Sequence, residues 1–307
     1  MKVASNTLVV ESSGVQSEAF FNIQESNVAH IFGILRNQLY SNKELAIIRE
    51  YCTNAFDAHV EAGIPDTPIQ ITFPTGFQNR LIIRDYGFGL SEENIYNVFA
   101  SYGASTKRDT NEQVGMLGLG SKSAFCYTND FTIVSYHKGV KSTYLAYIDE
   151  TNIGKISKID ESPTTESGLA VEIEIKSYDV YTFKHQACQF LRDFTPVPNI
   201  VNDDNLLAEI KNKKQHSYII DTPEYKLYWG YHLKNVIRMG NVNYEFNTSD
   251  LNISYHADFK MFEHGRVYIN APIGSVVPSA SRESLEFNAQ TKQYIIGKLL
   301  EIKDKVT

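Results

Sequence analysis

One stretch, residues 43–61, constrains the fold more than any other, because its side chains recur at helical spacing on two different faces. The apolar stripe consists of Leu45, Ile48, Cys52, Phe56 and His59. The polar stripe carries Glu50, Asn54 and Asp57 at positions i, i+4 and i+7. Asn and Asp in mid-helix cost about 0.5 kcal/mol each relative to Ala. The polar stripe is either a solvated surface or a functional one, and the helix taken alone favours the solvated surface.

The composition narrows the class of protein. With 307 residues, 42% of them hydrophobic, the chain is long enough for two domains with their own cores. A net charge of -7 argues against a dedicated nucleic-acid surface. No apolar run approaches the roughly 20 residues of a transmembrane helix, and the N-terminus lacks the apolar core of a secretory signal. Three widely spaced cysteines suit a reducing compartment without disulfides or a zinc cluster, so we expect a cytoplasmic protein.

The order of the predicted elements indicates an α+β layered sandwich followed by a smaller second domain. The predicted strands of the first domain are residues 7–11, 18–23, 69–73, 80–84, 131–136, 142–148 and 169–175. Its predicted helices are residues 26–39, 43–61 and 91–101, and residues 102–114 read as a mobile loop. We expect the first domain to cover residues 1–177. The second domain, residues 178–307, is predicted to hold a helix at 179–194, strands at 227–232, 236–246 and 266–269, and a C-terminal helix at 288–303.

Three segments together favour nucleotide binding. The first is the helix that carries Glu50. The second is a strand end followed by Asp85-x-Gly87-x-Gly89, where the carboxylate can accept a hydrogen bond from the amine of adenine and the glycines allow close approach of a base. The third is a glycine loop, Gly115-x-x-Gly118-x-Gly120, that precedes a predicted helix and can present N–H groups to phosphates.

Two commoner phosphate motifs are excluded. A Walker loop needs Gly-Lys-Ser/Thr in sequence, but Ser121 separates Gly120 from Lys122. The dinucleotide fingerprint also fails, because its third glycine is replaced by Ser123 after Gly118 and Gly120, and by Glu92 after Gly87 and Gly89.

The three motifs in this order resemble the GHKL (Bergerat-fold) ATPase superfamily, which includes gyrase B, the Hsp90-like chaperones, histidine kinases and MutL. Residues 39–44 followed by Arg49-Glu50 are similar to the chaperone, and residues 104–107, Ala-Ser-Thr-Lys, are similar to MutL and gyrase. Segments 118–125, 135–139, 145–149 and 278–285 resemble the bacteriophage rIIA-like rapid-lysis family. Members of that family can be much longer, which leaves open that this chain is an N-terminal portion.

The resemblance implies a Bergerat-type two-layer sandwich, a transducer-like second domain, and a site for ATP and Mg²⁺. It implies that Glu50 is the general base, that Asn54 is the Mg²⁺ ligand, and that Asp85 reads adenine. The other residues implied to line the ATP site are Asp57, Ala58, Gly87, Gly89, Leu90, Ser105, Thr106, Gly115, Met116, Gly118, Leu119, Gly120, Ser121 and Lys122. Lys107 occupies the place of a catalytic lid lysine.

The role of Arg282 and the support of the adenine-reading acid each leave alternatives. Arg282, before the C-terminal helix, resembles the middle-domain arginine that reaches the γ-phosphate; the alternatives are Lys292 in that role, or an Arg282 salt bridge with Glu283 or Glu286 on the surface. Relatives support the adenine-reading acid with a Thr after a Gly, but here Gly168 is followed by Leu169. Either Thr165 or Ser167 replaces that support, or the support is missing.

The resemblance also implies partners. We expect a slow ATPase, or alternatively a non-hydrolysing ATP/ADP-binding switch or chaperone-like scaffold. The implied partners are a second copy of the chain in an ATP-dependent homodimer and an rIIB-like protein. The implied setting is lysis inhibition in the cytoplasm of an infected bacterium, with peripheral association with the inner membrane.

Overall fold

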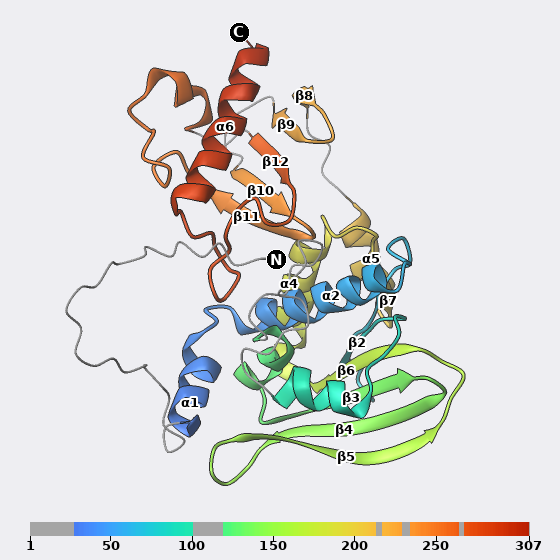
Figure 1. Ribbon diagram of the computed structural model, residues 1–307. Helices are drawn as coiled ribbons and strands as arrows, with labels where there is room; N and C mark the ends of the chain where they lie inside the picture. Colours follow the sequence, from blue (N-terminus) through green and yellow to red (C-terminus); the bar gives the residue numbers. More distant parts are fainter. Residues whose placement is uncertain (1–27, 101–118, 213–216, 229–233, 264–266, 307) are drawn as a thin grey trace, which may run out of the picture.

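A computed structural model of the protein describes residues 28–100, 119–212, 217–228, 234–263 and 267–306 (Figure 1). Within these ranges the chain forms two β-sheets, each with helices packed on it. The strands predicted at residues 7–11 and 18–23 and the loop predicted at 102–114 lie outside the described residues. None of the helices in the described part combines the length and the apolar character needed to cross a bilayer.

The first sheet has seven strands in the order β5-β4-β3-β6-β2-β1-β7. All neighbouring pairs are antiparallel except β1 and β7, which are parallel. The strands are β1 Gln70–Thr72, β2 Arg80–Arg84, β3 Asp130–His137, β4 Val140–Ile148, β5 Gly154–Pro163, β6 Gly168–Glu174 and β7 Asn199–Val201. Strands β5 and β7 were not predicted from the sequence. β5 is an edge strand in which no residue is buried, and β7 has only three residues.

The register of this sheet places one apolar row against the helices. Ile71 pairs with Ile83, Ile83 with Val171, Val171 with Ile133, and Ile133 with Tyr144, and each is at most 3% exposed. The same core cluster includes Ile47, Ile48, Tyr51, Cys52 and Ala55 from the second helix. Burial of this row fixes the register, because a one-residue shift would turn it to the opposite face.

The helices of the first unit are α1 Val28–Gln38, α2 Lys43–Glu61, α4 Val180–Leu191 and α5 Asp204–Lys211. Short helical segments are α3 Glu92–Ile95, the π-helix Tyr96–Ala100, and the 3₁₀ segments Gly120–Cys126 and Ser177–Asp179. The predicted helix at 43–61 is confirmed to the residue. The predicted helix at 91–101 begins as expected, with the Ser91 side chain accepting a hydrogen bond from Asn94 N, but it widens into the π-helix.

The second unit is a five-stranded sheet in the order β11-β10-β12-β9-β8, with α6 packed on it (Figure 1). Its elements are β8 Tyr218–Asp221, β9 Tyr225–Tyr228, β10 Asn235–Met239, β11 Val242–Phe246, the 3₁₀ segment Ala257–Phe262, β12 Val267–Ala271 and α6 Ala289–Val306. The single strand predicted at 236–246 is wrong. It is a hairpin, because Gly240, at φ +62°, reverses the chain between Met239 and Val242.

The predicted α+β architecture, with a two-layer sandwich followed by a smaller unit, is confirmed. The first unit extends further than expected, however. β7 pairs with β1, and the first core includes Phe183, Leu191, Ile200 and Ile210. Elements that follow residue 177, where the domain boundary is expected, therefore share the first sheet and its core. Helix α5 and strand β8 were not predicted from the sequence.

Candidate functional site

Helix α2 carries two acidic side chains into the interior. Its N-cap, Asn42, accepts a hydrogen bond from Leu45 N at 3.0 Å, and the helix contacts the first sheet, α4 and the 3₁₀ segment at Gly120–Cys126. Glu50 and Asp57 are each only 2% exposed, whereas Asn54 is partly exposed. A solvated surface is therefore wrong for the two acids, and their burial requires positively charged or hydrogen-bonding partners.

The partner of Glu50 comes from the second unit. Arg282 Nη1 donates to Glu50 Oε2 at 2.8 Å, and Arg49 Nε donates to Glu50 Oε1 at 3.2 Å. The side chains are 3% exposed for Glu50, 4% for Arg49 and 10% for Arg282. Burial lowers the pKa of Arg282, but Glu50, Tyr244 and Asp57 raise it more, so its net pKa lies above the usual value. Asp57, itself buried, contributes to this shift through its negative charge.

Arg282 sits in a strained backbone position. Its φ is +57°, a left-handed conformation that costs a residue with a Cβ about 1 kcal/mol or more. Its Nε and Nη2 are buried without a hydrogen-bond partner in the part of the chain that the structure describes. The hydroxyl of Tyr244 also interacts with this guanidinium. A buried guanidinium can in addition bind an anionic ligand such as a phosphate.

These contacts decide one of the alternatives for Arg282. The predicted surface salt bridge with Glu283 or Glu286 is wrong, because Arg282 pairs with Glu50 and the Glu283 carboxylate binds Ser41 and Asn42. Lys292 lies within α6 and is partly buried.

The Asp85 carboxylate is held by backbone groups at the end of β2. Asp85 is 4% exposed, and its Oδ1 accepts hydrogen bonds from Gly87 N at 2.9 Å and Leu169 N at 3.2 Å. Asp85 N in turn donates to Leu169 O at 2.9 Å. The backbone N–H of Leu169 therefore binds the Asp85 carboxylate directly, at the position where relatives carry the Thr. Ser167 Oγ donates instead to Tyr86 O, at 3.5 Å.

Three glycines allow the Asp85 turn to pack. A Cβ at Gly87 would approach Ala58 O to 2.9 Å, and a Cβ at Gly89, at φ +65°, would collide with Tyr136 O. A Cβ at Gly168, at φ +110°, would collide with Asp85 O. This packing requires glycine without any ligand, so contact of Gly87 and Gly89 with a base stays a prediction. The need for Gly168 was missed, since a lone glycine at a strand start carries no clear signal.

Two buried polar side chains hold the residues that follow Asp85. His59, 0% exposed, accepts at Nε2 from Tyr86 N at 2.8 Å and donates from Nδ1 to Thr67 O at 2.8 Å, which requires a neutral ring. Burial lowers its pKa, although the bond to Thr67 opposes that shift. The prediction of His59 as a packed core residue is confirmed. Ser135, whose role was missed, accepts from Leu90 N at 2.8 Å and donates to Leu90 O at 2.7 Å.

The end of the predicted glycine loop lies against Glu50. Residues 120–126 form a 3₁₀ helix, so the helix expected after the glycines is present in a tighter form. A Cβ at Gly120 would collide with Glu50 Oε2. The Tyr51 hydroxyl donates to Ser121 O at 3.0 Å and accepts from Ala124 N at 3.2 Å, which fixes this segment to α2.

Lys122 is directed into the protein. Its Nζ donates to Val98 O at 2.6 Å and to Ser121 Oγ at 3.1 Å, and burial lowers its pKa to about 8. Leu119 and Gly120 are partly buried at the edge of the same segment. The remaining predicted residues of the loop and lid lie outside the described residues, namely Ser105, Thr106, Lys107, Gly115, Met116 and Gly118.

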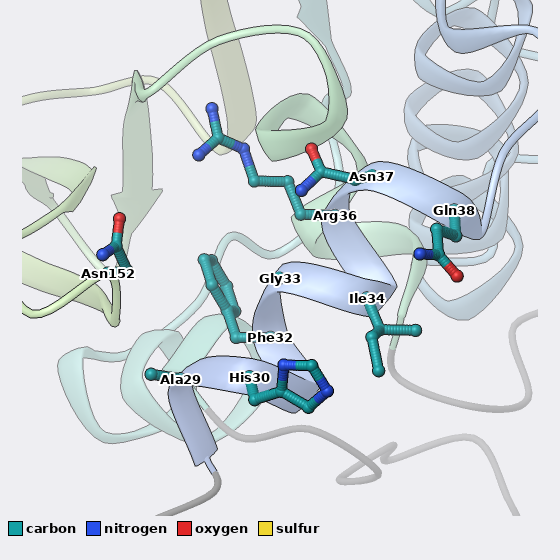
Figure 2. Close-up of a pocket in the computed structure, with 9 residues that line it drawn as sticks. All are labelled: Ala29, His30, Phe32, Gly33, Ile34, Arg36, Asn37, Gln38 and Asn152. Carbon is teal, nitrogen blue, oxygen red and sulfur yellow. The ribbon is translucent and has the colours of Figure 1, made fainter.

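A separate hollow of about 490 Å³ lies on α1 (Figure 2). Its lining consists of Ala29, His30, Phe32, Gly33, Ile34, Arg36, Asn37, Gln38 and Asn152. It includes none of the predicted site residues. The predicted site residues come together along α2 instead. There the Gly120 segment packs against Glu50, and the turn after Asp85 packs against Ala58.

Comparison with known proteins agrees with this geometry. Residues 40–182 match the family model described as "Histidine kinase-, DNA gyrase B-, and HSP90-like ATPase". The chain is 30% identical over 162 residues to the B subunit of type 2 DNA topoisomerase 6 from Pyrococcus horikoshii, covering 50% of this chain and 29% of that protein. It is 25% identical over 179 residues to Chaperone protein HtpG of Buchnera aphidicola subsp. Cinara cedri, covering 50% of this chain and 28% of that protein.

These alignments span less than a third of either relative. The matches support the GHKL superfamily for residues 40–182, which contain α2 and strands β1 to β6, and with it an ATP-binding domain.

Proposed function

We propose that this chain is an ATPase of the GHKL type, which binds ATP with Mg²⁺ along α2 and hydrolyses it slowly. The observation that carries the proposal is the meeting of Glu50, Gly120 and Arg282, from three separate parts of the chain, around one buried carboxylate. A guanidinium beside this carboxylate is also suited to bind a phosphate group.

The direction of the nucleotide follows from α2. Glu50 and Ala58 are eight residues apart, or about 12 Å along the helix axis. With adenine at Asp85 and Ala58, an extended triphosphate runs toward Glu50 and the Gly120 segment. Asn54, partly exposed one turn after Glu50, would hold Mg²⁺ through its amide oxygen, and the bound ion would neutralise charge on the phosphates.

Glu50 is the proposed base that orients and deprotonates the attacking water. In the present geometry Glu50 Oε2 accepts a hydrogen bond from Arg282. Transfer of the Arg282 guanidinium to the terminal phosphate would release that oxygen for the water. Hydrolysis would then depend on how the second unit docks, which is a reason to expect slow turnover.

The test is phosphate release from ATP by the purified protein and by its Glu50→Gln variant. We expect slow, Mg²⁺-dependent release by the native chain, release at background level by the variant, and similar affinity of both for a fluorescent ATP analogue. Equal release by both proteins, at a rate above background, would show that Glu50 is not the base.

One observation favours a second candidate, a non-hydrolysing ATP/ADP switch or chaperone-like scaffold. Both oxygens of Glu50 accept hydrogen bonds from guanidinium groups, which leaves the carboxylate less able to bind a water. In that case the native chain would bind ATP tightly but release no more phosphate than Glu50→Gln.

The biological setting is proposed from the sequence resemblance alone. A chain of the rIIA type would act in lysis control or in escape from host exclusion, in the cytoplasm of an infected bacterium and peripheral to its inner membrane. The proposed partners are a second copy in an ATP-dependent homodimer and an rIIB-like protein. Sedimentation with and without a non-hydrolysable ATP analogue tests the dimer, and co-purification from infected cells tests the protein partner.

A further inference from the structure

Three consecutive residues of the second unit bind to the beginning of α2. Arg49 Nη2 donates to Ser281 O at 2.7 Å, and Arg282 Nη1 donates to Glu50 at 2.8 Å. The Glu283 carboxylate accepts from Ser41 Oγ at 2.8 Å, Ser41 N at 3.0 Å and Asn42 N at 3.1 Å. The cationic Arg282 thus contacts α2 at Glu50, and the anionic Glu283 contacts the residues just before the helix.

The Glu283 contact is suited to the start of a helix. The N–H groups there have no partner within the helix, and the helix dipole favours a negative charge. The Asn42 side chain already caps α2 by accepting from Leu45 N, so its own N–H is available to Glu283. Hydrogen bonds to an ionised acceptor are stronger than neutral ones, and here three converge on one carboxylate.

The loop that carries these residues is internally fixed. Ser279 N donates to Ser284 O at 2.9 Å, Arg282 N donates to Ser279 O at 2.9 Å, and Pro278 bridges to Leu285. Because the backbone of this turn is fixed, the position of one side chain also determines the position of the next. Anchoring Glu283 on Ser41 and Asn42 therefore also sets where the Arg282 guanidinium lies.

We propose that Glu283 is a positioning residue, which docks the second unit on the N-terminal end of α2 and thereby places Arg282 beside Glu50. The docking contact stands by itself, whereas its effect on turnover rests on the proposed ATPase function. Ser41 and Asn42, which lie just before the helix that carries the proposed base, are then the docking site for the second unit.

The test uses Glu283→Ala with Glu286→Ala as the matched control. Glu286 is exposed in the same segment, and removing it changes the net charge equally. Hydrogen exchange of the peptide that contains Ser41 and Asn42, followed by mass spectrometry, reports docking without any nucleotide. We expect faster exchange in Glu283→Ala, an intermediate rate in Glu283→Gln, which keeps one acceptor oxygen, and no change in Glu286→Ala.

The second measurement is ATP turnover. We expect kcat to fall about tenfold in Glu283→Ala, as for loss of a charge-assisted contact, while affinity for a fluorescent ATP analogue stays within about twofold. In an Arg282→Ala background the Glu283→Ala change should have no additional effect on kcat, because Glu283 acts through Arg282.

The outcomes separate the two proposals. Unchanged exchange in Glu283→Ala would overturn the docking contact, whatever the enzyme activity. Faster exchange with unchanged kcat, or full additivity with Arg282→Ala, would overturn the positioning role. Absence of turnover in the native chain would overturn the proposed ATPase, and the exchange experiment would still decide whether Glu283 docks the second unit.

Discussion

Replacement of Glu50 by Ala should destabilise the protein strongly, apart from any effect on catalysis. The change removes the carboxylate that accepts from both Arg49 Nε and Arg282 Nη1, within a cluster where every side chain is at most 10% exposed. Breaking a buried ion pair by removing one partner costs about 3–5 kcal/mol. We expect a loss near the lower end of that range, because Arg49 keeps its bond to Ser281 O and Arg282 keeps its attraction to Asp57.

Urea and thermal unfolding followed by circular dichroism measure this loss. For a chain of this size, each kcal/mol lost from the free energy of unfolding lowers the melting temperature by about 2–4 °C. A loss of about 3 kcal/mol should therefore lower it by roughly 6–12 °C. Glu61→Ala is the matched control, since Glu61 ends the same helix and is exposed, and it should change the free energy of unfolding by less than about 0.5 kcal/mol. Equal stability of Glu50→Ala and Glu61→Ala would refute the buried charge cluster. Glu50→Gln keeps an acceptor oxygen, should lose about half as much, and is the better variant for activity.

Three further predictions follow from the Asp85 turn. Asp85→Asn should weaken binding of an ATP analogue roughly 10–100-fold and reduce the preference over GTP, because a carboxylate acceptor is lost; fluorescence titration checks both. The pKa of His59 is lowered by folding, so below pH of about 6.5 the unfolded chain takes up a proton that the folded chain does not. The free energy of unfolding should therefore fall as the pH decreases, by up to about 1.4 kcal/mol per pH unit, and this component should vanish in His59→Gln. Gly168→Ala should destabilise by at least about 2 kcal/mol through its positive φ and collision with Asp85 O, whereas Gly297→Ala, in the open interior of α6, should stabilise by up to about 1 kcal/mol in thermal unfolding.

The parts of the fold that follow from local pattern could be predicted from the sequence. Helix α2 was found to the residue, because its apolar side chains recur at helical spacing along its length. Strand β2 was also found to the residue, because it alternates between apolar and polar residues. Strand β7 and helix α5 were missed, because what holds them in the first unit is tertiary packing against β1 and α4.

The chemistry of the site was easier to predict than its electrostatics. Residue types and spacing pointed to Glu50 and Asp85, and the family resemblance pointed to Arg282. No pattern indicated that Arg282 would pair with Glu50 itself, since the two are 232 positions apart. The Thr expected to support Asp85 is absent, and a backbone N–H at Leu169 takes part of that place. Backbone hydrogen bonds do not depend on residue type, so a comparison of side chains could not have found this one.

The most direct measurement is a structure of the protein with a non-hydrolysable ATP analogue and Mg²⁺. Our account predicts adenine hydrogen-bonded to Asp85, the metal at Asn54, and the terminal phosphate within reach of Glu50 and Arg282. Nucleotide bound elsewhere, for example in the hollow on α1, or bound along α2 with its phosphates at the Asp85 end, would contradict it.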